Sequence, residues 1–495
     1  MAYSIEQQPH RFTAASSPMV YIVKESTGSI TGAAKFRYIV QVEISETDSS
    51  SFSTIAKIKL HKNSASVGIV DIHKIVRNYL EIQKADQNST TNSIHSLGIS
   101  VPLKPFSQTE SQAVLVRVKG GYEKASSQSA APVEELAPTG TYTSNISVSI
   151  PATTPYTKTA SNVGGLDDDD AGNNMPLLYY INDTSAEDSY SFLTNAPTTQ
   201  FVRGSSTSSD NVDELTICFK QGNGASGSAI VLGDKLEYMA IQYFDSSGSL
   251  IAGTAGSSQI HYFANSNANG GATAAQSNTA QEAILYFGCG TANLQTQSLS
   301  NFARPSNFTN WAYYRICGTT TNATTDNQPD DRCTKWYYFY RYGSGASVDD
   351  RHQSCTRYDN IRLAWRNRLG AWDYMNFRGK STESVGIKRT DIARVPGTWD
   401  SATFSYNNWD GGKQSLFTEA TRKLTINSDW LNEDEAVWLE ELFTSINIQI
   451  LGDDNIVYPV ILTDKTYTKK TSVNNKIKIQ YTIKLEYANK VRTNS

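Results

Sequence analysis

The sequence contains little cysteine. Only Cys218, Cys289, Cys317, Cys333 and Cys355 occur among 495 residues, and no two of them have the CxxC spacing. A secreted disulfide scaffold would have more cysteines in an even-numbered, regular pattern. The sparse and odd-numbered cysteines therefore predict synthesis in a reducing cytoplasm, without a disulfide framework.

Charge and long apolar runs are also scarce. Charged residues make up 19% of the chain and the net charge is −4, so no basic footprint for nucleic acid is present. No run approaches the ~18 apolar residues that a membrane span needs. The opening residues lack the basic and apolar regions of a secretory signal. We expect no nucleic-acid partner, no membrane partner and no secretory signal.

Motifs with catalytic spacing are missing as well. HExxH, GxSxG and Walker A do not occur. The segment GNGASG, with Gly222, Gly224 and Gly227, superficially matches GxGxxG, but it precedes the strand-like residues Ala229–Leu232. A hairpin turn is therefore favoured over a dinucleotide loop. Nothing selects the carboxylate pair of a glycosidase. We predict no enzymatic activity, no catalytic residue and no cofactor.

One acidic run is a candidate cation site. Asp167 to Asp170 follow Gly164 and Gly165. Carboxylate oxygens suit calcium, but the run lacks the ladder of ligands and the closing Glu of an EF-hand. A solvated loop is the alternative that we favour.

A second candidate metal site uses sulfur and nitrogen. As a zinc site, Cys333, His352 and Cys355 would supply three ligands, and Cys317 or Cys289 would supply the fourth. Structural zinc sites usually use two short-spaced pairs, and here only His352 and Cys355 are closely spaced. Buried structural thiols are the favoured alternative, so we predict no metal site.

Aromatic residues, in contrast, are abundant. The chain has 27 Tyr, 17 Phe and 8 Trp, and its polar character comes mainly from uncharged residues. Disordered chains are poor in aromatics. The composition favours a mainly β protein made of several antiparallel β-sandwich-like domains, with a few short helices and long polar loops.

The segment Tyr358–Phe377, YDNIRLAWRNRLGAWDYMNF, predicts a β-hairpin. Ile361, Leu363 and Trp365 alternate with polar or small residues, which is typical of a strand with one buried face. Asn367–Gly370 predicts the turn, because Gly adopts positive φ at no steric cost. A second aromatic run, Trp372–Phe377, completes the hairpin.

Two helices are predicted from apolar spacing. One covers residues 71 to 80, with Asp71 as N-cap. The other covers residues 432 to 444, where Asn432 and Glu435 form a capping box.

Composition divides the chain into four segments. Residues 1–125 are expected to form an N-terminal β domain with one helix, and residues 126–174 a linker or arm rich in Ser, Thr, Pro and Gly. Residues 175–380 are expected to form a central β-sandwich-like domain, and residues 381–495 a C-terminal α+β domain. Strands are expected at Met19–Val23, Phe36–Ile44, Ile55–Leu60, Ala113–Val118, Leu177–Ile181, Leu215–Phe219, Leu236–Phe244, Ala283–Phe287, Trp311–Ile316, Trp336–Tyr342, Ile448–Leu451, Ile456–Leu462 and Ile477–Tyr487.

Four aromatic residues are candidates for a sugar-binding platform. They are Trp372, Trp399, Tyr406 and Trp409. Packing in a core or an interface is the more frequent use of such residues and is the favoured alternative.

Three stretches resemble virion structural proteins of tailed bacteriophages, of the kind found in marine and Bacteroidetes phages. They are PHRFTAASSPMVYIV with the following KFRYIVQVEI and GIVDIHKIVRNYL, then residues 358–377 with Ile387–Thr390, then EAVWLEELFTS through KIKIQYTIKLEYAN. The resemblance implies a component of the tail, baseplate or neck that assembles as a ring and adapts one part to another. It transfers no catalytic residue.

We therefore expect a non-enzymatic structural protein of a phage tail (baseplate, hub, neck or fibre-adaptor ring). Its partners would be copies of itself and other tail proteins, with a tail fibre or a host surface glycan as further candidates. It would be made in the host cytoplasm and reside in the virion tail. The alternative is a carbohydrate-binding receptor or adhesin module that uses the aromatic-rich central segment, and a third hypothesis is a virion-borne glycan depolymerase.

Overall fold

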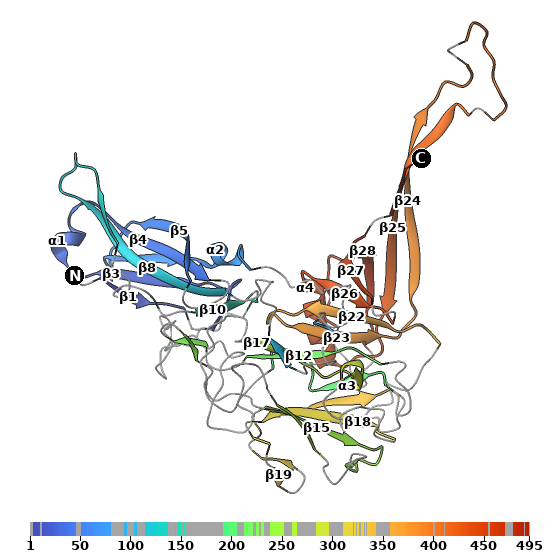
Figure 1. Cartoon of the computed structure of the whole chain (residues 1–495), viewed down its shortest axis with the longest axis horizontal. Helices are drawn as coiled ribbons and strands as arrows, with labels where there is room; N and C mark the ends of the chain where they lie inside the picture. Colours follow the sequence, from blue (N-terminus) through green and yellow to red (C-terminus); the bar gives the residue numbers. More distant parts are fainter. Residues whose placement is uncertain are drawn as a thin grey trace. The chain divides into compact units, whose positions relative to one another are not determined.

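The protein is described by a computed structural model whose described part consists mainly of β-strands, with a few short helices (Figure 1). Most strand pairs are antiparallel, which confirms the predicted fold class. The described residues are 3–9, 12–45, 51–80, 94–96, 103–105, 114–136, 144, 147–150, 152–153, 192–204, 212–220, 224–226, 229–231, 238–251, 260–264, 284–296, 310–319, 321–322, 324–325, 328–330, 332, 334–342, 357–398, 401–409, 411–453, 456–470, 479–489 and 491–494.

The chain separates into two compact units. The first consists of residues 1–353 and 366–373, and the second of residues 354–365 and 374–495. The division into four segments by composition stays a prediction.

An N-terminal sandwich begins the first unit. Apolar side chains from two sheets share one buried cluster, which includes Tyr21, Tyr38, Val70 and Val116, as expected for sheets packed face to face. The strands predicted at the start of the chain are confirmed. One sheet orders β1 (Tyr3–Gln7), β3 (Val20–Glu25) and β6 (Val67–Asp71), and the other orders β2 (Phe12–Ala14), β10 (Ser147–Ile150), β8 (Val114–Ala125), β4 (Ala34–Ser45) and β5 (Ser53–Leu60), with β9 (Val133–Leu136) on β8.

Part of the expected linker belongs to this sandwich. β9 and β10 both lie within residues 126–174, and both pair with β8. The linker prediction is therefore wrong for these two strands. A polar stretch of this kind is typical of a linker. Here β9 is nevertheless part of the sheet, because ion pairs on the sheet surface hold it instead of apolar burial. Residues 154–191, with the strand expected at Leu177–Ile181, lie outside the described residues.

The helix expected at residues 71–80 is shorter in the structure. α2 covers His73–Arg77, and Ile72 occupies the N-cap position. Asp71 instead ends β6, and its carboxylate accepts backbone N–H groups from Met19 and His73 at 3.0 and 3.1 Å. The predicted cap residue therefore satisfies a donor at the helix start, but from one position earlier in the chain. A second short helix, α1 (Gly28–Thr31), was not predicted.

Two further sheets complete the first unit. The strands expected between residues 215 and 342 are found within two residues of their predicted ends, except that β18 ends at Thr319, three residues beyond the predicted Ile316. The five-stranded sheet orders β11 (Thr199–Val202), β21 (Tyr337–Arg341), β18 (Tyr313–Thr319), β15 (Tyr238–Phe244) and β16 (His261–Ala264). The three-stranded sheet orders β12 (Thr216–Lys220), β17 (Ile284–Gly288) and β7 (Leu103–Pro105), and the pairs β13 (Gly224–Ser226) with β14 (Ala229–Val231) and β19 (Thr324–Thr325) with β20 (Gln328–Pro329) stand apart.

A buried polar network anchors the unpredicted helix α3 (Thr291–Thr296). The fully buried Asp213 carboxylate accepts from Arg203 Nε at 2.7 Å, and the Asp213 N–H donates to Thr291 Oγ1 at 2.8 Å. Asn293 Oδ1 accepts from the N–H of Leu215 at 2.8 Å. These bonds satisfy groups that would be costly to bury alone.

The second unit is built on one eight-stranded sheet (Figure 1). Its order is β23 (Trp372–Phe377), β22 (Ile361–Arg366), β26 (Ile448–Leu451), β27 (Val457–Leu462), β28 (Thr482–Tyr487), β25 (Lys413–Asn427) and β24 (Thr382–Ala393), with β29 (Val491–Asn494) also on β25. The predicted hairpin is confirmed as β22 and β23, and Gly370 in its turn has a φ of 87°. β22 is buried on both faces, including Arg362 and Arg366, so the prediction of one buried face is wrong.

The helix predicted at residues 432–444 is confirmed as α4 (Glu433–Thr444). Asn432 Oδ1 accepts from the Glu435 N–H, and the Glu435 carboxylate accepts from the Asn432 N–H, both at 2.7 Å. With 12 residues, α4 is the longest helix in the described residues, and none there has the length and apolar character needed to traverse a bilayer. Trp438 of α4 packs against Trp365 of β22, with ring centroids 5.0 Å apart.

Trp438→Ala should lower the free energy of unfolding by ~3–5 kcal/mol, because it leaves a cavity beside Trp365. Trp409→Ala is the matched control, since Trp409 is 80% exposed and should be replaceable at little cost. Urea unfolding of the two full-length variants measures the difference. Equal stabilities would contradict the assignment of Trp438 to the core.

The pairing of β9 should weaken in acid. Lys57 and Lys59 lower the pKa of Glu134, and Tyr122 and Lys124 lower the pKa of Glu135, both below the ordinary 4.5. A carboxyl group with a lowered folded pKa stabilises above its ordinary pKa and loses that contribution as the pH falls through the folded value. Hydrogen exchange of Val133–Leu136, corrected for intrinsic rates, should therefore accelerate below about pH 4.5.

In a Glu134→Gln, Glu135→Gln variant, these amides should already exchange faster at pH 7 and show no further acid-dependent loss. Exchange from β4 serves as the internal reference. Protection of β9 that is unchanged down to pH 3 would contradict the role given to the two carboxylates.

Candidate functional site

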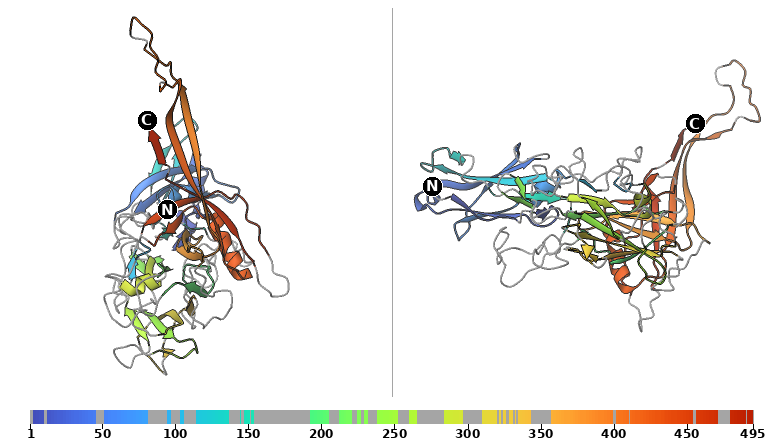
Figure 2. Two further views of the ribbon diagram at one scale, coloured as in Figure 1. Left: turned by 90° about the vertical axis from the view of Figure 1, so that its right-hand side faces the viewer. Right: turned by 60° about the horizontal axis from the view of Figure 1, so that its bottom comes forward.

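A long ribbon leaves the edge of the second unit's sheet. β24 and β25 pair antiparallel from Thr382 opposite Thr425 to Ala393 opposite Lys413. Beyond β24, β25 pairs with β28 over residues 423–427 and with β29 over residues 417–420. Within the described residues β24 has no second neighbour strand, and the ribbon extends away from its own sheet in all views (Figures 1 and 2). We call β24, β25 and the connecting residues 394–412 the arm.

The arm exposes a large share of the described apolar surface. Every residue of β24 except Thr390 is exposed. Eight of the 18 exposed large apolar side chains in the described residues belong to the arm, so the exposure is concentrated there. They are Val385, Ile387, Ile392, Val395, Phe404, Tyr406, Trp409 and Leu416. Such a concentration of exposed apolar side chains is typical of an interaction surface.

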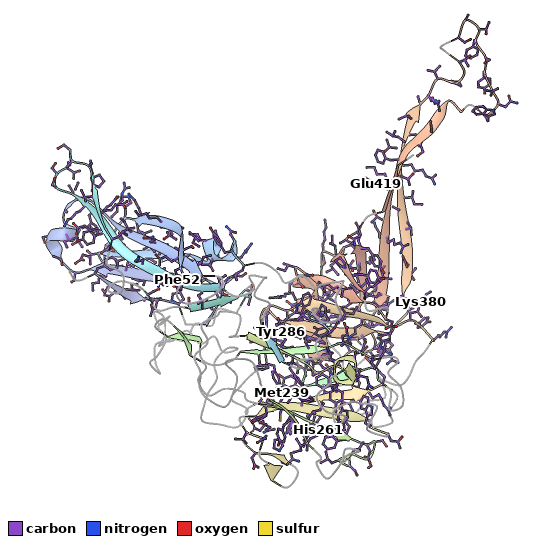
Figure 3. All side chains as sticks on the ribbon, viewed as in Figure 1. Phe52, Met239, His261, Tyr286, Lys380 and Glu419 are labelled. Atoms are coloured by element: carbon purple, nitrogen blue, oxygen red, sulfur yellow. The ribbon has the colours of Figure 1, made fainter. Side chains whose placement is uncertain are left out.

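The strand register determines how the apolar side chains lie. Val385 is directly opposite Arg422, and Ile387 is opposite Ala420, so these side chains share one face of the ribbon. The pairing shifts by one residue between Thr390 and Asp391, which makes Leu416 the extra residue of a bulge. Figure 3 shows side chains, including the labelled Glu419, projecting from the ribbon rather than into a core. An isolated two-stranded ribbon is only marginally stable in water, so this geometry favours a covering partner.

Ion pairs occur near both ends of the ribbon. Lys413 Nζ lies 2.9 Å from Asp391 Oδ2, and Arg422 Nε lies 3.8 Å from Glu383 Oε1. The Lys413 ammonium group lowers the pKa of Asp391. Exposed pairs of this kind add little stability, so they do not replace the apolar cover that the ribbon lacks.

The loop at the end of the arm is organised around a glycine. Gly397 has a φ of +93°, and a Cβ at this position would lie 2.6 Å from a Phe404 ring carbon. Thr398 N–H donates to the Ser405 carbonyl, and Ser405 N–H donates to Thr398 Oγ1, both at 3.0 Å. The loop therefore holds Phe404 against the glycine while it presents Tyr406 and Trp409 to solvent.

The structure separates the four residues of the expected sugar platform. Trp372 is 2% exposed and packs edge-on to His95 at a centroid distance of 4.8 Å. The prediction of a core position is therefore confirmed for Trp372, and its place in a sugar platform is wrong. Tyr406 and Trp409 are exposed on the arm, and Trp399 lies outside the described residues.

The central segment carries its own row of aromatic side chains. Phe244, Tyr313 and Tyr340 lie opposite one another on neighbouring strands, and both ring-to-ring distances are 4.7 Å. Phe201 continues the row at 6.0 Å from Tyr340. Phe244, Tyr313 and Tyr340 stack on each other, so their faces stabilise the sheet instead of forming an open platform for a sugar, whereas the ring of Phe201 is tilted relative to Tyr340.

The other sequence candidates supply no assembled chemical site in the described residues. No group there combines three side chains suited to a metal ion. Cys218, Cys289 and Cys317 are buried, and burial raises the pKa of the Cys218 thiol. Cys333, His352, Cys355 and Asp167–Asp170 lie outside the described residues. The GNGASG segment contributes to the hairpin of β13 and β14, as predicted.

The arm itself was missed by the sequence analysis, apart from the Ile387–Thr390 fragment noted in the resemblance. The sequences of β24 and β25 lack the regular alternation of apolar and polar residues that indicates a strand with one buried face. A signal was present nonetheless: β-branched residues recur in both Thr382–Ala393 and Lys413–Asn427, on either side of a loop rich in Gly, Ser and Asn.

Comparisons with known proteins found weak structural similarity alone. No protein-family model and no curated protein matches the sequence. A chain from the tail of an empty GTA particle, determined with C6 symmetry, is 10% identical over 27% of this chain and 95% of that chain, with a TM-score of 0.16. A Salmonella alpha-2-macroglobulin mutant is 8% identical over 100% of this chain and 30% of that chain, also with a TM-score of 0.16. At such TM-scores neither similarity supports an argument about fold or function.

Gly397→Ala should open the end of the arm, because alanine combines an unfavourable positive φ with a clash against Phe404. Limited proteolysis within residues 394–412 should become faster, while the global unfolding midpoint stays unchanged. Gly386→Ala is the matched control, since its added Cβ meets only the Thr421 carbonyl oxygen at 3.7 Å. Equal cleavage of both variants and the wild type would contradict the role of Gly397.

Proposed function

We propose that this chain is a non-enzymatic structural protein of a phage tail, and that it assembles with copies of itself through the arm. The observation that carries the assembly proposal is the concentration of exposed apolar side chains on a ribbon with an open edge strand. The tail location rests on the resemblance of three sequence stretches to virion structural proteins. The arm and this resemblance are independent arguments, and the proposal contains no catalytic step.

The physical case for a second copy begins with β24. Its outer edge presents backbone N–H and C=O groups, which natural proteins normally cover or protect with charge. Val385 and Ile387 are 51% and 58% exposed, and they stand on the same face of the ribbon. A neighbouring subunit would bury these side chains and the strand edge together. A ring of such contacts would place each arm on the next subunit, which suits a baseplate, hub, neck or adaptor position next to other tail proteins.

The test compares two sets of charged substitutions. Val385→Lys with Ile387→Lys places two charges on the exposed face of the arm, and Ile446→Lys is the control at a 75% exposed residue outside the arm. Light scattering of the full chain should give a multi-subunit mass for the wild type and the control. The double variant should give the 54.5 kDa of one chain, with an unchanged circular dichroism spectrum.

A wild-type chain that stays monomeric at assembly concentrations would contradict the proposal. A double variant that assembles as readily as the wild type would exclude the arm as the contact.

One observation favours a second candidate function, which is glycan binding. Tyr406 and Trp409 are 54% and 80% exposed on the same loop, and exposed aromatic faces can stack on sugars. A Trp409→Ala variant that loses binding to a glycan array but keeps the wild-type mass would support this function. Wild-type protein that binds no glycan on the array would exclude it.

A further inference from the structure

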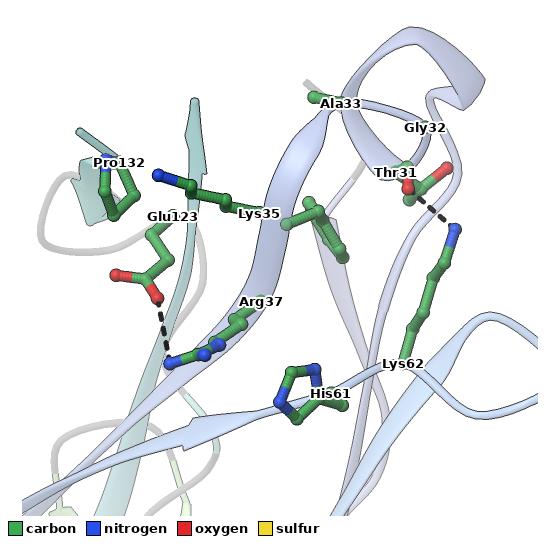
Figure 4. Close-up of a pocket in the computed structure, with 10 residues that line it drawn as sticks. Thr31, Gly32, Ala33, Lys35, Arg37, His61, Lys62, Glu123 and Pro132 are labelled. Atoms are coloured by element: carbon green, nitrogen blue, oxygen red, sulfur yellow. Dashed lines mark hydrogen bonds and ion pairs between the residues drawn. The ribbon is translucent and has the colours of Figure 1, made fainter. Parts of the chain in front are cut away.

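A basic pocket lies at one end of the N-terminal sandwich, far along the chain from the arm residues (Figure 4). Its volume is about 440 Å³, within the range of ligand pockets. The basic side chains of Lys35, Arg37, His61 and Lys62 line it, together with the single acidic side chain of Glu123. The pocket is thus rich in cationic groups on a chain whose net charge is negative.

The Glu123 carboxylate in the pocket already has two cationic partners, Lys59 and Arg37. Glu123 is 3% exposed, and Lys59 Nζ lies 2.6 Å from its Oε2. Arg37 Nη1 lies 3.8 Å from its Oε1, which is drawn as a dashed line in Figure 4. Two cations therefore neutralise Glu123, and the charges of Lys35 and Lys62 are additional to this network.

The two additional ammonium groups are positioned by backbone carbonyls instead of carboxylates. Lys35 Nζ donates to the Ala130 carbonyl at 2.8 Å, and Lys62 Nζ donates to the Thr31 carbonyl at 2.7 Å. Across the part of the chain that the structure describes, no carboxylate lies within 4.0 Å of either group. An ammonium group has three donors, so each lysine keeps donors for a ligand.

A backbone irregularity places Lys35 at this pocket. The β4–β8 pairing shifts between Ala34 and Arg37, so the strand bulges at the intervening residues. Lys35 has a φ of 53°, a left-handed conformation that is uncommon for a residue with a side chain. Bulges change the direction of a side chain, and strained residues of this kind gather at binding sites.

We propose that this pocket binds a run of carboxylate side chains on a polypeptide segment. Lysine ammonium groups on the two sides of the pocket in Figure 4 suit two separate carboxylates. Phe36 and Pro132 supply apolar wall for the carbon atoms of a peptide. A nucleic acid would need a longer basic track, but the neighbouring Lys57 and Lys59 are already paired with Glu134. This inference does not depend on the arm.

The chain's own sequence provides a suitable probe. A synthetic peptide that copies residues 164–172, GGLDDDDAG, presents four adjacent carboxylates, and GGLNNNNAG is the uncharged control. The full-length protein should bind the Asp peptide and not the Asn peptide by calorimetry or fluorescence anisotropy. Binding should weaken as the salt concentration rises from 50 to 200 mM, because the contacts are electrostatic.

Charge-reversal variants test whether Lys35 and Lys62 bind the peptide. Lys35→Glu with Lys62→Glu should weaken binding of the Asp peptide about tenfold or more, because two attractive contacts become repulsive. Lys74→Glu with Arg77→Glu is the matched control, since it makes the same change in net charge on exposed residues of α2. The Lys35→Gln, Lys62→Gln variant is a second test, because it removes the two positive charges without placing new carboxylates next to the fold. It should also weaken binding of the Asp peptide.

Three outcomes would overturn the inference. The first is a wild-type protein that binds neither peptide. The second is equal weakening by the pocket variant and the α2 control, which would indicate an effect of net charge alone. The third is inorganic phosphate that binds the pocket at millimolar concentration while the Asp peptide does not. Because the mass measurement on the arm uses other variants, failure of either proposal can be distinguished from failure of the other.

Discussion

The second unit depends on β25, a single strand that changes from core to surface along its length. Leu424 and Ile426 are 6% and 1% exposed, where β24 and β28 flank the strand. Toward its N-terminal end β25 is exposed or half-buried, and at residues 413–416 its only described partner is β24. Burial of the base fixes the register of the whole ribbon. The exposed part inherits that register, although its own side chains bury little surface.

The strands that were predicted correctly are those whose stability comes from apolar burial. A strand-like segment bounded by Ser, Gly and Asn identified β4, and a short-range capping signal identified α4. The last strand was expected at Ile477–Tyr487, but β28 covers only Thr482–Tyr487, and Ile479 forms an isolated bridge with Leu431. β9 was missed because Glu134 and Glu135 hold it to Lys57, Lys59 and Lys124 through charge, and a polar sequence of this kind also suits a linker. Lys57 and Lys59 lie on β5, far from β9 in the sequence, so no local pattern reports these two partners, although Lys124 lies on β8, the strand that precedes β9.

The error at β22 has a related cause. Alternation of Arg362 and Arg366 with apolar residues indicated one exposed face, since arginine is seldom buried. In the structure the Arg362 guanidinium lies 5.5 Å from the ring centre of Tyr374, and that of Arg366 lies 6.0 Å from the ring centre of Trp372. Cation–π contacts and the long aliphatic stems of arginine permit this burial. The alternation of residues along a strand therefore shows which side chains point to the same face of the sheet. Whether one or both faces are buried depends on the elements that pack against the sheet.

The two candidate surfaces differ in the kind of recognition that their residues permit. Apolar contacts on the arm would supply most of the affinity, because removal of apolar area from water is the main driving force of association. They discriminate poorly between partners. Charged contacts in the pocket would in addition select the sign and spacing of the partner's charges. The pocket was not predictable, because its residues come from β4, from β8 and from the two residues after β5, which are widely separated in the sequence, and because Lys35 lies in a bulge that no local pattern indicates. An assembly protein that used both surfaces would obtain most of its affinity from the arm and its selectivity between partners from the pocket.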